Sequence, residues 1–357
     1  MRVNYIVAGG GTGGHIVPAL AIAHRLRMAE HKVSYIGNKD SLEERIVRNE
    51  RIPFLAINVQ KLYRKLTLAH LKFPVLLISS IFKCLSYLKQ TNARAIICTG
   101  GYISGPIAIA AILKRIDLYI WDGNSFPGLT TRLIARRARA VFTAYDATAQ
   151  RLPGANCQNL GIPVKDNIST TETGWKPELV GLSATKKIIL ITGGSQGSLA
   201  INRAVESSID HLLKNGYTIL WQTGKTSYKE IKTRVGDKAG LYLFDFTDNM
   251  PQMMAYSHLA ITRAGAMTIA ELETNNLPAI LVPLPTAAEN HQHYNAVEQE
   301  KKGVAMLLDQ SKLNAENLIK CITDLEKHYQ SYKTALESLP PNNATDAIVN
   351  YVLSKSH

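Results

Sequence analysis

The chain has 357 residues, of which 46% are hydrophobic, and this length predicts two domains because a single core stops growing at smaller sizes. Its four cysteines form no Cys-x-x-Cys pair, which argues against a zinc site or a disulfide framework and favours a reducing compartment. With no apolar run near the ~20 residues of a spanning helix and no signal-peptide core, we expect a protein that is neither secreted nor integral to a membrane.

The formal net charge of +13 is concentrated in the first half of the chain. Residues 1–164 contain 22 Lys and Arg against 8 Asp and Glu, whereas residues 165–357 contain 19 against 20. A one-sided basic domain indicates a polyanionic partner, either nucleic acid or an anionic membrane surface.

Apolar runs of strand length alternate with helix-length stretches along both halves, which predicts two doubly wound parallel sheets. The expected strands are 5–8, 33–36, 95–98, 118–121 and 140–143, then 187–192, 218–222, 241–244, 259–262 and 279–282. Clear helices are expected at 18–30, 128–137 and 343–353. The rhythm pauses in the polar segment 165–185, so we expect an N-terminal domain over 1–163, a C-terminal domain over 164–341, and a last helix within 342–357 that can return to the first domain.

The first expected strand ends in a glycine-rich turn, loop 1 (residues 9–14), which presents backbone amides and a helix N-terminus to a phosphate. Its Gly9-x-Gly11-x-x-Gly14 pattern fits the dinucleotide fingerprint, so an NAD oxidoreductase is one alternative. That fingerprint also needs an acid closing the second strand, where this chain has Asn38 and Lys39. NAD is therefore less favoured.

His15 follows loop 1 directly and is expected at the start of a helix. A helix N-terminus favours the neutral imidazole that a general base needs, so we predict that His15 is the base. The simpler interpretation is a structural histidine bonded to backbone or water. Its glycine-rich surroundings favour the catalytic one.

The segment 60–90 combines a wide apolar arc with cations. Val75, Ile78, Phe82 and four further apolar residues fall on one side of a helix, and lysines such as Lys61, Lys65 and Lys72 surround them. An interfacial membrane helix has this pattern, because methylenes enter the acyl boundary while lysines meet lipid phosphates. An ordinary helix buried between two neighbours has it as well.

Two further glycine-rich turns follow apolar runs: loop 2 (residues 99–105) and, in the second half, loop 3 (residues 193–197). The loop 3 amides and the Ser195 hydroxyl suit a diphosphate, with Lys165 as an additional cation. Glu271, in a later strand–turn–helix unit, suits the two hydroxyls of a ribose. The amides of Gln292 and Asn295 share a helix face and suit sugar hydroxyls.

The chain contains no D-x-D, H-E-x-x-H or P-loop motif. These absences argue against a P-loop kinase and give no support to a metal-assisted mechanism. We therefore expect no metal and no cofactor.

Together, GGGTGGHIVPALAIA, GGYISGP, GGSQGS and RAGAMTIAEL followed by PLPTAAENHQHYNA closely resemble the MurG family over nearly the whole chain. These bacterial enzymes transfer N-acetylglucosamine (GlcNAc) from UDP-GlcNAc to the C4 hydroxyl of MurNAc in undecaprenyl-linked lipid I, forming lipid II for peptidoglycan synthesis. The resemblance implies a GT-B fold, two facing Rossmann-like domains with an interdomain cleft, and an inverting, metal-independent hexosyltransferase. It also implies a peripheral protein on the cytoplasmic face of the bacterial inner membrane, with partners among the cell-wall synthesis proteins.

The resemblance also assigns site residues. It implies that the UDP-GlcNAc donor meets Ser195, the run Ala266, Met267, Thr268, Ile269, Ala270 and Glu271, and Gln292, completed by Thr12, Gly13, Gly14 and Asn124. The acceptor pyrophosphate is expected at Gly11, Gly101, Tyr102 and Ser104 of the first two glycine turns. An anionic inner-leaflet surface is expected at Lys61, Lys65, Lys72, Val75 and Phe82.

Several positions depart from the family pattern. Asp122 and Gly123 replace the usual Glu-Gln before Asn124, Lys165 replaces an arginine, and Thr247 replaces an isoleucine expected near the uracil. We expect altered donor affinity rather than altered chemistry. A nucleotide-dependent nucleic-acid-binding protein stays the alternative from another class, but it depends on charge alone, so we expect no nucleic-acid partner.

Overall fold

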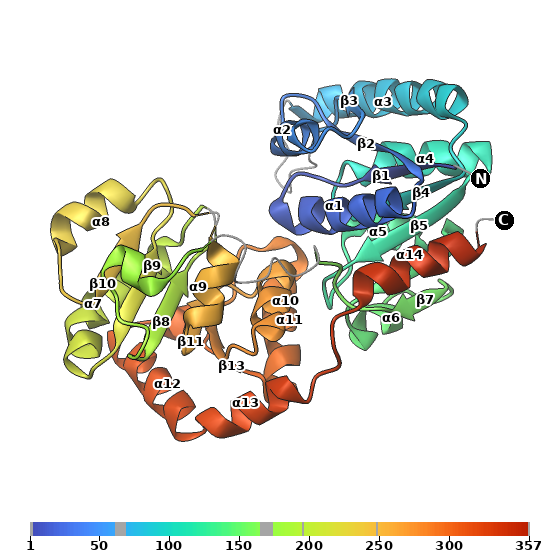
Figure 1. The fold of residues 1–357 in the computed structure, drawn as a ribbon. Coiled ribbons are helices and arrows are strands. Elements are labelled where there is room, and N and C mark those ends of the chain that lie inside the picture. Colours follow the sequence, from blue (N-terminus) through green and yellow to red (C-terminus); the bar gives the residue numbers. More distant parts are fainter. Residues whose placement is uncertain (1–2, 61–68, 165–173, 195, 248, 356–357) are drawn as a thin grey trace. The chain divides into compact units, whose positions relative to one another are not determined.

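The computed structural model describes residues 3–60, 69–164, 174–194, 196–247 and 249–355, without the side chains of residues 69–72 and 288. The chain divides into two compact units (Figure 1). One comprises Met1–Asp166 with Asn342–His357, and the other comprises Asn167–Pro341. The last helix thus belongs to the first unit.

Within its described residues, the first unit is a parallel sheet of order β3-β2-β1-β4-β5-β6-β7 covered by helices. The strands are β1 (Asn4–Ala8), β2 (Lys32–Asn38), β3 (Phe54–Ile57), β4 (Ala95–Cys98), β5 (Asp117–Asp122), β6 (Ala140–Thr143) and β7 (Cys157–Asn159). The helices are α1 (Gly13–Met28), α2 (Leu42–Asn49), α3 (Ala69–Thr91), α4 (Ser104–Lys114), α5 (Leu129–Ile134), α6 (Asp146–Gln150) and α14 (Ala344–Lys355), with a 3-10 turn at Ala135–Arg137.

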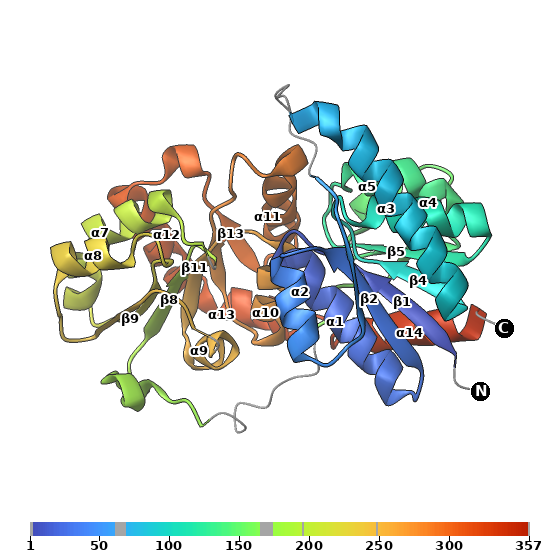
Figure 2. The same ribbon diagram turned by 90° about the horizontal axis from the view of Figure 1, so that it is seen from above.

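Helix α14 lies beside α1 on one face of this sheet (Figure 1, Figure 2). An ion pair between Arg25 of α1 and Asp346 of α14 joins the two helices. The Thr345 hydroxyl donates to the Val164 carbonyl oxygen at 2.8 Å, where the chain leaves the first unit. Buried Ile348 and Val352 supply the apolar side of α14. These contacts explain why a segment at the end of the chain completes the first unit.

Helix α3 divides the apolar arc that the sequence shows in this segment. Cys84 and Leu88 pack into the core against the sheet and α4. Val75, Ile78 and Phe82 point outward, with 68%, 53% and 66% of their surfaces exposed. One side of α3 thus meets the core and the other meets solvent, and membrane contact of the outer side stays a prediction.

Within its described residues, the second unit is a parallel sheet of order β10-β9-β8-β11-β12-β13. The strands are β8 (Ile188–Thr192), β9 (Thr218–Gln222), β10 (Leu241–Phe244), β11 (Leu259–Thr262), β12 (Ala279–Leu281) and β13 (Ala305–Leu307). The helices are α7 (Leu199–Lys214), α8 (Tyr228–Val235), α9 (Met250–Tyr256), α10 (Ala266–Thr274), α11 (His291–Lys301), α12 (Ala315–Lys327) and α13 (Tyr329–Glu337), with 3-10 turns at Pro177–Val180, Ala288–Asn290 and Gln310–Lys312.

Each sheet has one position where the chain reverses its direction of winding. In the first sheet β1 lies between β2 and β4, and in the second β8 lies between β9 and β11. Ligands of doubly wound proteins bind outside the carboxyl ends of the strands at such switch points. Loops 1 and 2 follow β1 and β4, and loop 3 follows β8, so all three glycine loops lie at a switch point.

Candidate active site

Loops 1 and 2 touch each other through glycines. A side chain at Gly101, whose φ is +76°, would bring its Cβ within 2.8 Å of the Gly10 carbonyl oxygen. At Gly11, with φ +83°, a Cβ would lie 2.9 Å from the Tyr102 ring. Only glycine combines these backbone angles with such close approach. The glycines therefore bring the ends of β1 and β4 together.

Loop 1 leaves the N-terminus of α1 open. Thr12 is the exposed residue before the helix, and its side chain makes no capping hydrogen bond. A Cβ built on Gly13 would meet nothing within 4 Å, and one on Gly14 would meet only the Thr12 hydroxyl oxygen at 3.7 Å. The space beside the first turn of α1 is thus open, as an anion site at a helix N-terminus requires.

His15 is held where the two loops meet. Its Nδ1 lies 2.8 Å from the Thr99 carbonyl oxygen, and the Thr99 hydroxyl donates to the His15 carbonyl oxygen at 2.7 Å. Because a carbonyl oxygen only accepts, Nδ1 carries the proton and Nε2 is the basic nitrogen of the neutral ring. The ring is therefore oriented as a general base would need to be.

The His15 ring packs against Gly100, where a side chain would clash with it. The φ of Gly100 is +91°, and a Cβ there would lie 2.9 Å from the ring atoms Cε1 and Nδ1. With His15 as the predicted base, we expect Gly100→Ala to displace the ring and to lower kcat roughly 10- to 100-fold, since small misplacements of a catalytic group are costly. Steady-state release of UDP measures this. Gly216→Ala is the matched control, because Gly216 has φ +85° with open space around it, and an equal loss in both variants would contradict the prediction.

A buried carboxylate lies behind loop 1. Glu43 of α2 is 1% exposed and accepts from the amides of Asn38, at 3.1 Å, and Gly11, at 3.3 Å. The Gly11 amide is therefore already bonded within the first unit, and its contact with the acceptor pyrophosphate stays a prediction. The same contacts leave Glu43 no exposed surface with which to bind a ribose.

Loop 2 differs from its prediction at one residue. Ser104 is 1% exposed, and its hydroxyl donates to the Gly100 carbonyl oxygen at 2.7 Å. It therefore supports the loop from inside instead of presenting a donor to a pyrophosphate, which corrects the expected role. Tyr102 and Gly101 are partly exposed at the tip of the loop.

Asp122 replaces the polar support that the family pattern has before Asn124. Its buried carboxylate accepts from the Asn124 amide N–H at 3.2 Å, from the Asn124 side-chain Nδ2 at 3.3 Å and from the Gly128 amide at 3.0 Å. Because Nδ2 donates to Asp122, the Asn124 side-chain oxygen is directed away from it. A Cβ on Gly123 would lie 2.3 Å from the Trp121 ring, so glycine is required between them.

In the second unit, loop 3 packs on the end of the neighbouring strand β9. A Cβ on Gly197, with φ +75°, would lie 2.1 Å from the Thr223 carbonyl oxygen. The Gln222 side chain donates to the Gly194 carbonyl oxygen at 3.1 Å. Gly194 itself has φ +86° and open space in front of it. Loop 3 is thus fixed on its inner side and open on its outer side.

Arg263, which follows β11, ties the loops of this edge together. It donates from Nη1 to the carbonyl oxygens of Val282 and Pro283, at 3.0 and 3.1 Å, and from Nη2 to the side chains of Ser198 and Gln310, at 2.6 and 2.7 Å. Burial lowers the pKa of the guanidinium to about 10, so it stays charged at neutral pH. Sequence reasoning missed Arg263; its one signal was a lone cation between a strand and a small-residue turn.

Helix α10 presents Glu271 and buries two residues of the predicted donor-binding run. No described donor contacts the partly exposed Glu271 carboxyl group, and desolvation raises its pKa to about 7. Ala266, Met267 and Thr268 lie partly exposed in the first turn. Ile269 and Ala270 are only 2% and 1% exposed, with Ile269 packed in the core. The helical period turns these two side chains towards the sheet, and the donor contact of this run stays a prediction.

The two amides of α11 differ in position. Gln292 accepts from the Leu284 amide at 2.9 Å, which leaves its NH₂ group as a donor. Asn295 is completely buried and donates to the Ala264 carbonyl oxygen at 3.2 Å. The predicted donor contact of Asn295 is therefore corrected to support of the turn before α10. The partly exposed Thr247 accepts from the Asn249 amide at 3.0 Å.

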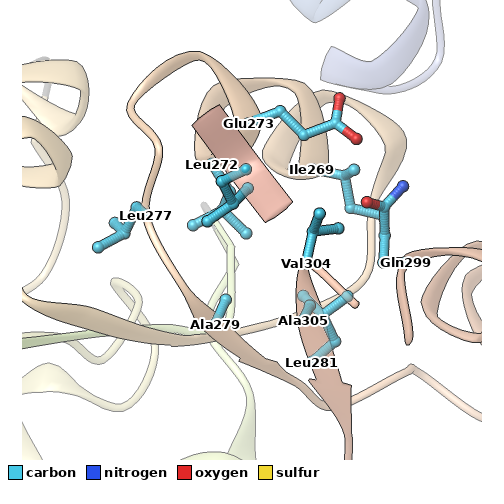
Figure 3. Close-up of a pocket in the computed structure, with 10 residues that line it drawn as sticks. Ile269, Leu272, Glu273, Leu277, Ala279, Leu281, Gln299, Val304 and Ala305 are labelled. Carbon is cyan, nitrogen blue, oxygen red and sulfur yellow. The ribbon is translucent and has the colours of Figure 1, made fainter. Parts of the chain in front are cut away.

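A small cavity lies on the inner side of α10 (Figure 3). Leu272, Leu281 and Val304 are among its lining residues, with Glu273 and Gln299 as polar members. Its volume is about 10 Å³, roughly the space of one water molecule. It is too small for a nucleotide, so the donor site we consider is the open edge at loop 3.

Some predicted contacts fall outside the described residues. These are Lys61, Lys65, Lys165 and Ser195, together with the side chain of Lys72. Among the residues that are described, no three His, Cys, Asp or Glu side chains gather as a metal site would require. No helix in the described ranges is long and apolar enough to cross a membrane.

Comparisons with known proteins agree with this architecture. The glycosyltransferase family 28 N-terminal domain matches residues 5–143, and the family 28 C-terminal domain matches residues 188–350. A crystal structure of Acinetobacter baumannii MurG superimposes with a TM-score of 0.79 at 27% sequence identity, covering 99% of this chain and 100% of that one. The two parallel-sheet units and their glycine loops define a glycosyltransferase with the GT-B fold.

Relatives of known name show which family of GT-B glycosyltransferases the chain belongs to. A protein of Bacillus pumilus is 34% identical over 354 residues, with 97% of each chain covered, and one of Flavobacterium psychrophilum is 33% identical over 359 residues, with 99% of this chain and 97% of that protein covered. Both are named UDP-N-acetylglucosamine–N-acetylmuramyl-(pentapeptide) pyrophosphoryl-undecaprenol N-acetylglucosamine transferase. The chain belongs to this MurG family.

Proposed function

We propose that this enzyme transfers GlcNAc from UDP-GlcNAc to the C4 hydroxyl of MurNAc in undecaprenyl-linked lipid I, forming lipid II with inversion at the anomeric carbon. His15 carries the proposal: its Nδ1–H donates to Thr99 between loops 1 and 2, so Nε2 is the nitrogen that can remove the acceptor proton. The family relationship supplies the substrates.

The second unit supplies the donor site in this proposal. Glu271 receives hydrogen bonds from the ribose hydroxyls, and the amide donors of Gln292 complement the nucleotide. Loop 3 and the N-terminus of α7 stabilise the diphosphate as it leaves. Asn124 and the open N-terminus of α1 act from the first unit.

The direct test uses the full-length protein with UDP-GlcNAc and a lipid I analogue. We expect release of UDP together with the β-linked disaccharide, detected by coupled assay and mass spectrometry. Folded protein that binds UDP-GlcNAc but forms no disaccharide would contradict the acceptor assignment. We also propose a metal-independent reaction, so EDTA in the assay should leave the rate unchanged.

We propose further that the outer side of α3 places the enzyme on the anionic cytoplasmic leaflet of a bacterial membrane. Val75, Ile78 and Phe82 are exposed there, beside the exposed cations Lys83 and Lys89. Exposed apolar side chains with flanking lysines supply the two terms of interfacial binding. Partners among other cell-wall synthesis proteins belong to the same proposal.

Replacing Val75, Ile78 and Phe82 together by serine should lower the affinity for anionic vesicles, measured by sedimentation, at least ~10-fold, because the interface loses three apolar side chains. Leu179→Ser combined with Leu199→Ser is the control, since these leucines are 71% and 64% exposed in the second unit. Equal binding of the triple variant and the wild type would contradict the membrane surface. Stronger binding to oligonucleotides than to vesicles at equal salt would favour the nucleic-acid alternative.

A further inference from the structure

Ser198 has a hydroxyl proton for which the described residues supply no acceptor. The residue is 6% exposed and precedes α7 as its N-cap. Its Oγ accepts from the Ile201 amide at 3.3 Å and from Arg263 Nη2 at 2.6 Å. A hydroxyl has two lone pairs and one proton, so both lone pairs are occupied. No described acceptor receives the proton, which therefore has to be donated to something that the described chain does not supply.

Arg263 adds a positive charge without a counter-ion. Its four hydrogen-bond acceptors are two carbonyl oxygens, a hydroxyl and an amide oxygen, all of them neutral. No carboxylate forms an ion pair with it among the described residues. Taking a charge out of water is costly unless an opposite charge compensates for it. A ligand that brings negative charge to this edge would supply that compensation.

We propose that the Ser198 hydroxyl donates a hydrogen bond to an anionic oxygen of the donor's diphosphate, with Arg263 behind it as the polarising cation. This assignment rests on the proposed function. A donor bonded to a cation is itself a stronger donor, because successive hydrogen bonds polarise one another. The amides at the start of the 16-residue helix α7 act on the same anion. Ser198 is thus a binding residue, and Arg263 is a positioning residue that acts through it.

Loop 3 limits where the phosphate can lie. A Cβ at Gly193 would come within 2.4 Å of the Ser198 amide nitrogen, so the chain folds back closely between the two residues. Gly194, on the same loop, faces open space. A phosphate entering over Gly194 therefore approaches the same helix N-terminus that Ser198 caps.

The test compares binding of UDP-GlcNAc and uridine to the full-length protein by calorimetry and competition. We expect Ser198→Ala to weaken the binding of UDP-GlcNAc at least ~10-fold, which is the range for losing a hydrogen bond to a charged group. The affinity for uridine should not change. Ser198→Thr, which keeps the hydroxyl, should restore most of the affinity. Arg263→Lys, which keeps the charge but loses the planar fork, should give an intermediate affinity.

Asn314→Ala controls for the lost helix cap. Asn314 caps α12 in the same unit and accepts from the Asn317 amide at 2.8 Å, so its loss should lower the melting temperature without changing affinity. Equal losses of UDP-GlcNAc affinity in Ser198→Ala and Asn314→Ala, or equal losses for UDP-GlcNAc and uridine, would overturn the assignment. Failure of the wild type to bind UDP-GlcNAc would instead overturn the proposed function.

Discussion

Replacing His15 by asparagine should lower kcat about 10²- to 10⁴-fold, the usual contribution of a general base. Asparagine can still donate from its side-chain amide to the Thr99 carbonyl oxygen, which His15 Nδ1 contacts at 2.8 Å. It has no basic nitrogen at neutral pH, however. The variant therefore separates the loss of a base from the loss of a loop contact, and His15→Ala removes both.

The measurement is kcat for UDP release at saturating UDP-GlcNAc and lipid I analogue, with the dissociation constant of UDP-GlcNAc determined separately. That constant should change little, because the proposed nucleotide contacts lie mostly in the second unit. His211→Ala is the control, since this exposed histidine of α7 lies at the opposite end of the helix from loop 3. Near-normal turnover of His15→Asn would remove the histidine from the role of base.

The central strands and the edge strand β10 could be predicted from sequence, whereas the other three edge strands could not. Runs such as 95–98, 140–143 and 218–222 coincide with β4, β6 and β9, because central strands of parallel sheets are continuous apolar segments. The missed strands β3, β7 and β13 all lie at the edge of a sheet. They are only three or four residues long, and Cys157–Asn159 is also partly polar, so they give too little pattern to distinguish a strand from a loop.

The site shows a similar division. The glycine loops could be found because positive φ angles and close contacts demand glycine whatever the tertiary context. Side-chain roles depended on hydrogen bonds between segments far apart in sequence, such as Glu43 to Gly11 or Arg263 to Ser198. A motif shows which residues lie near a loop but not which of them are buried beneath it. Ser104 and Asn295 were therefore predicted to contact ligands, whereas both are buried and bond to the loop backbone. That the loops of the two units face one another stays a prediction.

Replacing Glu271 by glutamine should lower the affinity for UDP-GlcNAc about 10- to 100-fold at pH 8, because the ribose hydroxyls lose a charged acceptor. The wild type should itself bind more tightly as the pH rises. Burial raises the pKa of the Glu271 carboxyl group to about 7, so most molecules carry a neutral acid at pH 6 and a carboxylate at pH 8. Affinity should increase about 10-fold over that interval, and the increase should disappear in the glutamine variant.

UDP-GlcNAc is the appropriate ligand for this titration, because the terminal phosphate of UDP titrates near ~6 and would add its own pH dependence. Glu298→Gln is the control: Glu298 lies on α11 of the same unit and pairs with Lys301 at 3.1 Å. This variant should keep both the affinity and its pH dependence. A pH-dependent rise that persists in Glu271→Gln would assign the titration to another group.

The same carboxyl group should make the protein less stable as the pH rises. A pKa that is higher in the folded chain than its ordinary value of 4.5 favours folding below pH 4.5, and this contribution is lost as the pH rises through about 7. At pH 8 the charged group costs at most about 3 kcal/mol, which the glutamine variant avoids. We therefore expect Glu271→Gln to raise the melting temperature at pH 8 and to change it little at pH 4. If the Glu271 carboxylate binds the ribose at a cost in stability, the glutamine variant should be more stable and should bind the donor less tightly. Loss of both stability and affinity would instead make Glu271 a structural residue.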